Sequence, residues 1–394
     1  LYSLICTSSA DAKNIDSIYI NGFLSQGYLR SSDNDYFDGS TQGVWNFSEV
    51  GLSFLVPLSD SLYFGTQVFS HRLGSGADSS LVVDWAFLDY GYERWLGVRV
   101  GKIKMPFGLY NKQRDIDYLR TPVLLPQTVY MEGFREFLVA IQGVELYGNL
   151  DFSKAGYLDY EVFLGTVDVS GNAGYIGNMM GLMRLELRDE PLDFDARLGL
   201  RGVSLSDLDV TIHHLEGFSF IWTIIPELRL GYSRFQASVN VALGGFINSD
   251  VKLSENSVAS IEYDKGKLTL IYEVLAVRMG VLDNLSLEGF ETDGWYAGST
   301  WHFNDELSAA ISYGESFALG SEAKESYFTS KGLPRYLGWQ KETTYSVSYQ
   351  LTESSLIKAE VKWIHGVGLS NPFETGFVPK ESWRVYALKA SVAF

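Results

Sequence analysis

The last twelve residues of the chain, Trp383–Phe394, alternate between two kinds of side chain. One set consists of Tyr386, Leu388, Ala390, Val392 and Phe394, and the other of Ala387, Lys389, Ser391 and Ala393. Neighbouring side chains of a β-strand point to opposite faces. This strand therefore needs an apolar medium on one face and water on the other, as a strand of a transmembrane barrel does. We expect an all-β, antiparallel transmembrane barrel that closes with Trp383–Phe394, whose final Phe394 carries the assembly signal.

The same alternation recurs in three further segments, 307–314, 344–351 and 356–363. In the second segment, Tyr345 and Val347 oppose Ser346 and Ser348. A soluble β-sandwich also alternates, but its inner faces are apolar. Polar residues on the hidden face of a wide barrel indicate a lumen filled with water.

Very short polar turns divide the chain into strand pairs. The seven turns are Ser59–Ser61, Glu93–Trp95, Phe152–Gly156, Asp189–Pro191, Asp264–Gly266, Asn304–Glu306 and Thr352–Ser354. A longer connection follows each pair, which is typical of barrels with short periplasmic turns and long external loops. An opening strand near Ile18–Leu29 and the closing strand bring the count to sixteen. This count treats residues 204–255 as one external loop, although Phe218–Ile225 and Phe235–Leu243 could be strands and would raise it to eighteen.

The composition favours one large architecture over several domains. The chain has 394 residues without a Pro/Ser-rich linker, and 14% of them are aromatic. It contains no run of 18 apolar residues, so no transmembrane helix is expected. The net charge of −17 argues against nucleic acid as a partner, because phosphate binding needs a basic surface.

The first twelve residues resemble the tail of a secretory signal peptide. An apolar run is followed by Ala10-Asp-Ala12, a possible cleavage site, although the basic start is missing. We expect residues 1–12 to be the remnant of this signal and residues 13–394 to form the barrel. The one cysteine, Cys6, lies in the remnant, and Ile5 before it argues against a lipoprotein.

The third external connection, about residues 105–139, is predicted to fold back against the inner wall. Pro106, Pro122 and Pro126 bend it, and its many apolar residues are poorly suited to an outer surface. The bases between residues 98 and 139 are Arg99, Lys102, Lys104, Lys112, Arg114, Arg120 and Arg135, and the acids are Asp115, Asp117, Glu132 and Glu136. Seven bases against four acids give a local charge of +3, which a narrow passage would focus. The same residues could instead pair with one another and anchor the loop, and both roles are compatible.

Alternation predicts which other charges face the lumen. The inward bases are Arg184, Arg197, Arg201, Lys358, Lys362 and Lys389, and the inward acids are Glu145, Asp159, Glu161, Glu186 and Glu360. Strict alternation from Val98 sends Lys102 and Lys104 toward lipid, so their place in the lumen requires a bulge at Gly101 or an early exit from the strand.

Three features resemble outer-membrane porins of the broad group that includes phosphate-selective porins. They are GKIKMPFGLYN at 101–111 with RDIDYLRTPVLLPQTVYMEGFRE at 114–136, the ladder of hairpins, and SWRVYALKASVAF at 382–394. The resemblance implies a bacterial outer-membrane location and a homotrimer of sixteen-stranded barrels whose third loop narrows each pore. It also implies contacts with lipid and lipopolysaccharide, and assembly machinery that reads the strand ending at Phe394. A phosphate-selective member would have a dense ladder of bases, whereas here carboxylates are interspersed.

The predicted function is passive diffusion of small hydrophilic solutes and ions, with a mild preference for anions at the constriction. One alternative is a structural or adhesive barrel, which requires the third loop to plug the lumen. A second is an outer-membrane hydrolase that uses Asp207, Asp209 and the adjacent His213 and His214 of the fifth loop. Adjacent residues of an extended strand face opposite sides, and no nucleophile, zinc or phosphate-loop motif is present. We therefore expect no enzyme activity, catalytic residue, metal or cofactor, and a soluble all-β binding protein would lack a core.

Overall fold

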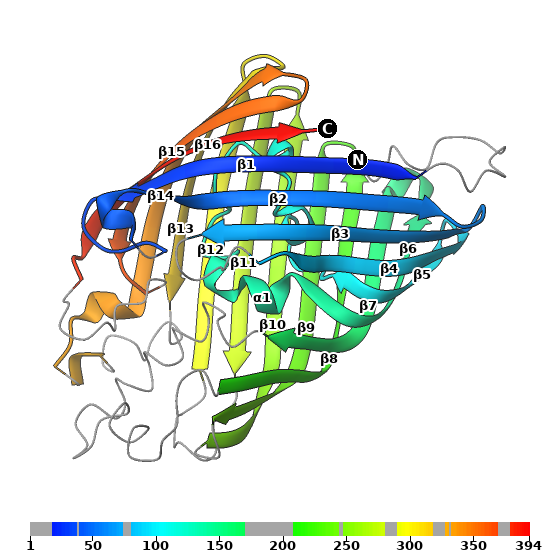
Figure 1. Cartoon of the computed structure of the whole chain (residues 1–394), viewed down its shortest axis with the longest axis horizontal. Coiled ribbons are helices and arrows are strands. Elements are labelled where there is room, and N and C mark those ends of the chain that lie inside the picture. Colours follow the sequence, from blue (N-terminus) through cyan, green and yellow to red (C-terminus); the bar gives the residue numbers. More distant parts are fainter. Residues whose placement is uncertain are drawn as a thin grey trace.

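The sixteen strands that the structure describes form one closed antiparallel barrel (Figure 1). The structure is a computed structural model, and it describes residues 18–37, 39–73, 80–169, 208–243, 247–279, 290–317, 328–330, 332–368 and 379–394. The strands are β1 (Tyr19–Ser31), β2 (Val44–Pro57), β3 (Leu62–Leu73), β4 (Val82–Glu93), β5 (Leu96–Lys104), β6 (Ala140–Asp151), β7 (Tyr157–Val169), β8 (Leu208–Ile225), β9 (Leu228–Leu243), β10 (Ile247–Lys265), β11 (Leu268–Met279), β12 (Phe290–His302), β13 (Leu307–Phe317), β14 (Trp339–Thr352), β15 (Ser355–Gly366) and β16 (Ser382–Ala393). The predicted fold class is confirmed, and the signal remnant lies outside the described residues.

Alternation of side chains gives the barrel two different faces. On β16, Leu388 is 53% exposed, whereas its neighbour Lys389 is 2% exposed. On β13 and β14, Ile311 and Val347 are likewise exposed, and they belong to the predicted outward sets. Exposed aromatic residues such as Trp95 cluster near the short turns, as in the aromatic girdles of membrane barrels. The outer face is therefore suited to lipid.

The barrel closes where β1 pairs with β16. The backbone amide of Gly22 donates to the carbonyl of Phe394 at 3.0 Å, and the amide of Phe394 donates to the carbonyl of Gly22 at 3.0 Å. Closure removes the free strand edges that would otherwise be left unpaired in lipid. The predicted roles of the opening and closing segments as neighbouring strands are confirmed.

Six of the seven predicted short turns lie between paired strands, and the seventh prediction lies outside the described residues at Asp189–Pro191. The expectation that residues 204–255 form one external loop is wrong. They contain β8, β9 and the first part of β10, and the short turn in this region is Pro226–Glu227, between β8 and β9. The count of sixteen is nevertheless confirmed, because β8 pairs directly with β7.

The error has a physical origin in the length of these strands. β8, β9 and β10 span 18, 16 and 19 residues, whereas β15 and β16 span 12 each. Long strands place turn residues farther apart than a regular ladder predicts, and Pro226–Glu227 is a turn of only two residues within an apolar run.

Helical structure in the described residues is limited to short segments. They are η1 (Ser40–Gln42), η2 (Asn111–Gln113), η3 (Asp117–Leu119), η4 (Glu132–Phe134), α1 (Arg135–Leu138), η5 (Ser153–Ala155) and η7 (Arg335–Gly338), together with residues 328–330. None of the helices in the described part of the chain is long and apolar enough to cross a membrane.

Candidate functional site

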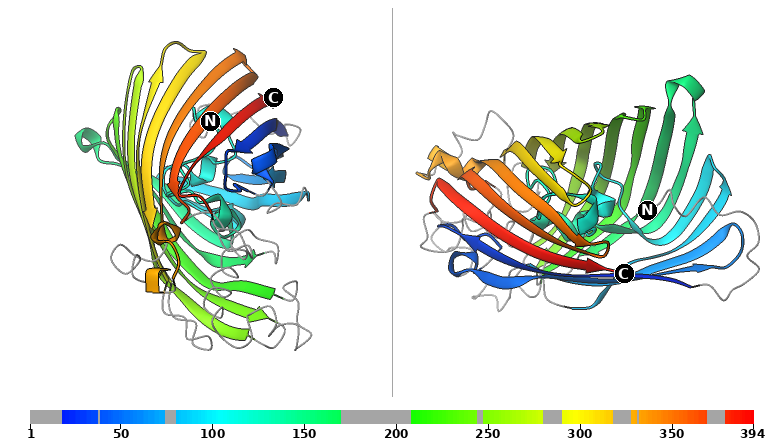
Figure 2. Two further views of the ribbon diagram at one scale, coloured as in Figure 1. Left: turned by 90° about the vertical axis from the view of Figure 1, so that its left-hand side faces the viewer. Right: turned by 90° about the horizontal axis from the view of Figure 1, so that it is seen from above.

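The connection between β5 and β6, residues 105–139, lies inside the ring of strands, and we call it L3. Both views of Figure 2 show this segment, with α1, between opposite walls of the barrel. L3 carries η2, η3, η4 and α1. It bonds to strands on several sides of the lumen, including Ser233 on β9, Ser308 on β13 and Ser391 on β16.

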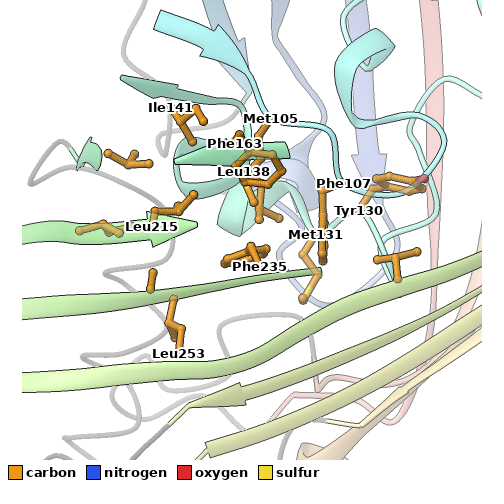
Figure 3. Close-up of a cluster of buried hydrophobic side chains, with 14 of the residues drawn as sticks. Met105, Phe107, Tyr130, Met131, Leu138, Ile141, Phe163, Leu215, Phe235 and Leu253 are labelled. Atoms are coloured by element: carbon orange, nitrogen blue, oxygen red, sulfur yellow. The ribbon is translucent and has the colours of Figure 1, made fainter. Parts of the chain in front are cut away.

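One side of L3 packs against the wall through apolar side chains (Figure 3). Met105, Phe107 and Tyr130 of L3 join inward residues of β4 to β11, among them Phe163 and Phe235, in one buried cluster. The rings of Phe107 and Phe235 meet edge to face, with their centroids 5.2 Å apart. Burial of a Phe side chain contributes about 1.5–3 kcal/mol, so this cluster is a strong attachment of L3 to the wall.

Three wall carboxylates accept hydrogen bonds from the backbone of L3. Glu273 on β11 accepts from the amide of Leu109 at 3.1 Å and from the hydroxyl of Tyr130 at 2.7 Å. Glu360 on β15 accepts from the amide of Val123 at 2.8 Å, and Glu342 on β14 accepts from the amide of Gln127 at 3.1 Å. Bonds to a charged acceptor are stronger than neutral ones. They hold L3 at intervals along its length.

Gly108 shows why the L3 sequence needs a glycine at its entry. Its φ is +65°, a region that residues with a side chain rarely adopt. A Cβ atom there would lie 2.5 Å from the hydroxyl oxygen of Tyr130. The Gly108 amide also donates to the Ser233 hydroxyl at 2.8 Å. Glycine thus permits both the turn and the close approach to the wall.

Asp117 joins L3 to β15 and β16. Its carboxylate lies 2.8 Å from Lys389 Nζ, 3.7 Å from Lys358 Nζ and 3.1 Å from Arg120 Nη2. It also accepts a bond from the Ser391 hydroxyl at 2.6 Å. Lys358 and Lys389 are almost completely buried, so these charges depend on each other for stabilisation.

A second ion-pair group lies within L3 and links it to the end of β5. Arg114 pairs with Glu132 at 2.7 Å, and Arg135 pairs with both Glu132 and Asp115. Lys104, the last residue of β5, reaches Asp115 at 2.6 Å. The bases and acids of L3 therefore pair with one another, which is the arrangement expected if they anchor the loop.

The pKa values of the L3 carboxyls reflect these pairs. Burial would raise the pKa of Asp115, but the charges of Arg135 and Lys104 outweigh burial and hold it well below its usual range. The same competition between burial and neighbouring bases lowers the pKa of Asp117, through Lys389 and Lys358, and that of Glu132, through Arg114 and Arg135. All three carboxyls are therefore ionised at neutral pH.

Several of the remaining predicted inward charges also form ion pairs, whereas Asp159 accepts a hydrogen bond from Asn149. Arg99 contacts Asp89 at 2.9 Å and Glu145 at 2.7 Å, and Lys112 contacts Glu161. Lys389 pairs with Glu49 in addition to Asp117, and Lys362 lies 3.5 Å from Glu342. Arg184, Glu186, Arg197 and Arg201 lie outside the described residues.

The assignment of Lys102 to the lumen is corrected by the structure. The pairing of β5 with β6 has no register shift at Gly101, so Lys102 keeps the outward parity of Val100, which is 51% exposed. Its Nζ donates to the carbonyl of Val83 at 2.6 Å. Lys102 pairs in register with Gln142, and Gln142 pairs with Thr166 of β7. A polar row therefore crosses the outer face at this height.

Beside the apolar cluster, the wall carries small side chains and L3 leaves a cavity. Inward positions on β12, β13 and β14 include Thr300, Ser308, Ser312 and Ser348. The cavity has a volume of ≈ 330 Å³ and lies between these residues and L3 residues 118–126. It extends to the turn at Asn304–Glu306, so it lies toward the end of the barrel that carries the short turns.

Sequence reasoning missed Glu273 and Glu342, whereas it had already assigned Ser308, Ser312 and Ser348 to the inward face. Each has a recognisable signal, because each belongs to the inward set of a strand with an apolar outward set. Glu342, for example, continues the inward series of Thr344, Ser346 and Ser348. The alternation could therefore have identified both acids as inward, but not their L3 partners.

The location that the hydrolase hypothesis assumed is wrong. His213 and His214 belong to β8 and not to a loop, and His214 has a positive φ at an irregularity in the pairing of β8 with β9. Asp207 lies outside the described residues. Within the described ranges, no group of three or more metal-ligating side chains is close enough to hold a metal ion.

The sequence matches no protein-family model and no curated protein. The structure is similar to OmpT, an outer membrane protein of Vibrio cholerae, in its trimer form (TM-score 0.59, 12% identity, covering 96% of this chain and 99% of that one). It is also similar to an anion-selective porin from Comamonas acidovorans (TM-score 0.56, 12% identity, 96% and 99%) and to the outer membrane channel DcaP of Acinetobacter baumannii (TM-score 0.58, 12% identity, 96% and 97%). The phosphate-selective subgroup is not indicated. These likenesses show a shared closed-barrel fold, whose exposed apolar outer face suits a lipid environment.

Proposed function

We propose that the protein is a porin, a water-filled channel for passive diffusion of small hydrophilic solutes and ions. The observation that carries the proposal is the ≈ 330 Å³ cavity between L3 and the small-residue wall of a closed barrel. L3 is attached to the wall by apolar packing on two sides of the barrel, so it narrows the lumen to the space that the cavity occupies. The porin and channel titles of two structural neighbours support the same proposal.

A mild anion preference is part of this proposal and rests on Arg120. Arg120 lines the cavity and also a separate crevice of ≈ 10 Å³, whereas Arg114 and Arg135 line only the crevice. Since Asp117 lies 3.1 Å from Arg120, most of this positive charge is compensated and the preference is small. A homotrimer is also proposed, supported by the trimer form of the Vibrio cholerae neighbour.

Ion conductance of the purified protein in planar bilayers tests the channel, and the reversal potential in a KCl gradient tests its selectivity. Arg120→Ala is expected to shift the reversal potential toward cations, whereas Arg120→Lys, which keeps the charge, is expected to retain the wild-type value. An unchanged reversal potential in Arg120→Ala would make Arg120 an anchor only.

The second candidate is a structural barrel with a plugged lumen. The observation in its favour is the reach of L3, which contacts Glu161 on β7, Glu273 on β11 and Glu360 on β15. The same bilayer measurement separates the two candidates. A correctly folded protein that passes no ion current would support the plug and refute the porin.

A further inference from the structure

We infer that the cavity beside L3 is a binding site for an uncharged, hydroxyl-rich solute of the size of a mono- or disaccharide. The inference rests on the proposed function, because it names the solute class of the same passage. The cavity volume of ≈ 330 Å³ lies at the lower end of the range typical of small-molecule sites, about 300–1,000 Å³.

The wall side of the cavity is rich in hydroxyl groups. Thr300, Ser308, Ser312 and Ser348 line it, and Gln350 adds an amide. Their strands hold them in adjacent rows, with Thr269 opposite Thr300 and Ser308 opposite Ser348. Each hydroxyl can both donate and accept a hydrogen bond, which is the pattern that the hydroxyl groups of a sugar require.

The L3 side of the cavity carries an apolar stretch next to Arg120 and Thr121. Pro122, Leu125 and Pro126 line it, and prolines lack the backbone N–H that would compete for a ligand hydroxyl. The Thr121 hydroxyl meets that of Ser308 at 2.8 Å and fixes L3 against the edge of the cavity. A hydroxyl-bearing wall that faces this apolar stretch suits a ring that has C–H faces and a hydroxyl-bearing edge.

Charge in the lining favours a neutral ligand over an anion. Arg120 is the base that L3 contributes to the described lining, and its guanidinium already donates to Asp117, to the carbonyl of Val123 at 3.2 Å and to the carbonyl of Arg114. At the mouth, His302 is accompanied by Asp305 and Glu306. An anion at the Nη atoms of Arg120 would therefore replace existing partners, whereas a neutral polyol elsewhere in the cavity would not.

The test uses the full-length protein in detergent, titrated calorimetrically with glucose, maltose and sucrose. We expect saturable binding of at least one sugar, and a concentration-dependent block of the ion current in bilayers. The double variant Thr300→Val, Ser348→Ala should weaken binding about tenfold or more, because it removes two hydroxyl partners with little change in volume. Thr166→Val, on the outer face of β7, is the matched control and should bind like wild type.

The outcomes separate this inference from the proposed function. A protein that conducts ions but binds none of the three sugars overturns the inference and leaves the porin standing. Block by inorganic phosphate but not by sugar overturns it in favour of an anion site. A protein that binds sugar saturably but passes no current supports the binding site and refutes the porin.

Discussion

Replacement of Asp117 by Asn should detach L3 from β15 and β16. The Asp117 carboxylate is 4% exposed and interacts with Lys389, Lys358 and Arg120. Asparagine keeps the shape of the side chain but removes the charge that these bases require. Removal of one partner from a buried ion pair typically costs about 3–5 kcal/mol, because the remaining charge is buried without compensation.

The lower end of this range applies here. Lys389 retains Glu49, and Lys358 retains bonds to the carbonyls of Asp117 and Arg120, both at 2.6 Å. If the free energy required to detach L3 falls by about 3 kcal/mol, the detached population rises roughly a hundredfold, because about 1.4 kcal/mol is a factor of ten.

The thiol reactivity of a buried reporter measures this population. Val123 is 0% exposed and lies against Glu360, so Val123→Cys reports detachment of L3. The background carries Cys6→Ser, because Cys6 is the one native cysteine. When L3 opens and closes faster than the reagent reacts, the modification rate follows the detached population. Asp117→Asn should therefore increase this rate about a hundredfold.

The control is Asp305→Asn, which removes the same charge from the exposed turn between β12 and β13. It should leave the modification rate unchanged. If Asp117→Asn and Asp305→Asn agree within about threefold, the proposed attachment through Asp117 is refuted.

Three further predictions concern L3. The folded pKa values of Asp115, Asp117 and Glu132 are lowered, so the stability that these carboxylates contribute is present above their unfolded pKa values near 4 and is lost as the pH falls through their folded values. Single-channel current noise should therefore stay constant from pH 7 to 5. A rise of the noise in this interval would contradict the ion-pair assignment. Gly294→Ala should loosen L3, because the added Cβ would lie 2.0 Å from the carbonyl oxygen of Thr128. Gly91→Ala, which has open space around it, should leave L3 in place. Equal modification rates of Val123→Cys in both variants would disprove the predicted loosening. Phe107→Ala should destabilise the loop cluster by about 3–5 kcal/mol, seen as faster modification of the same reporter, and a rate equal to that of the unsubstituted reporter would show that the cluster does not hold L3.

The sequence by itself determined the class of protein. Alternation with a period of two residues is a local property, so Trp383–Phe394 and Thr344–Leu351 display their two faces without reference to the rest of the chain. The same local pattern predicted that Lys389 and Glu360 face inward and that Leu388 faces outward. In the structure the first two are buried and Leu388 is exposed. It did not locate the turn at Pro226–Glu227, because strand length varies and one apolar run covers both strands.

Only the tertiary structure decided the partners of the L3 charges and the side on which a passage remains. Asp117 and Ser391 are 274 positions apart, and Leu109 and Glu273 are 164 apart. Their contact depends on the path of L3 across the lumen, which no local pattern encodes. The sequence therefore supplied an excess of bases in L3, whereas the fold paired them with carboxylates and left the cavity beside small hydroxyl residues.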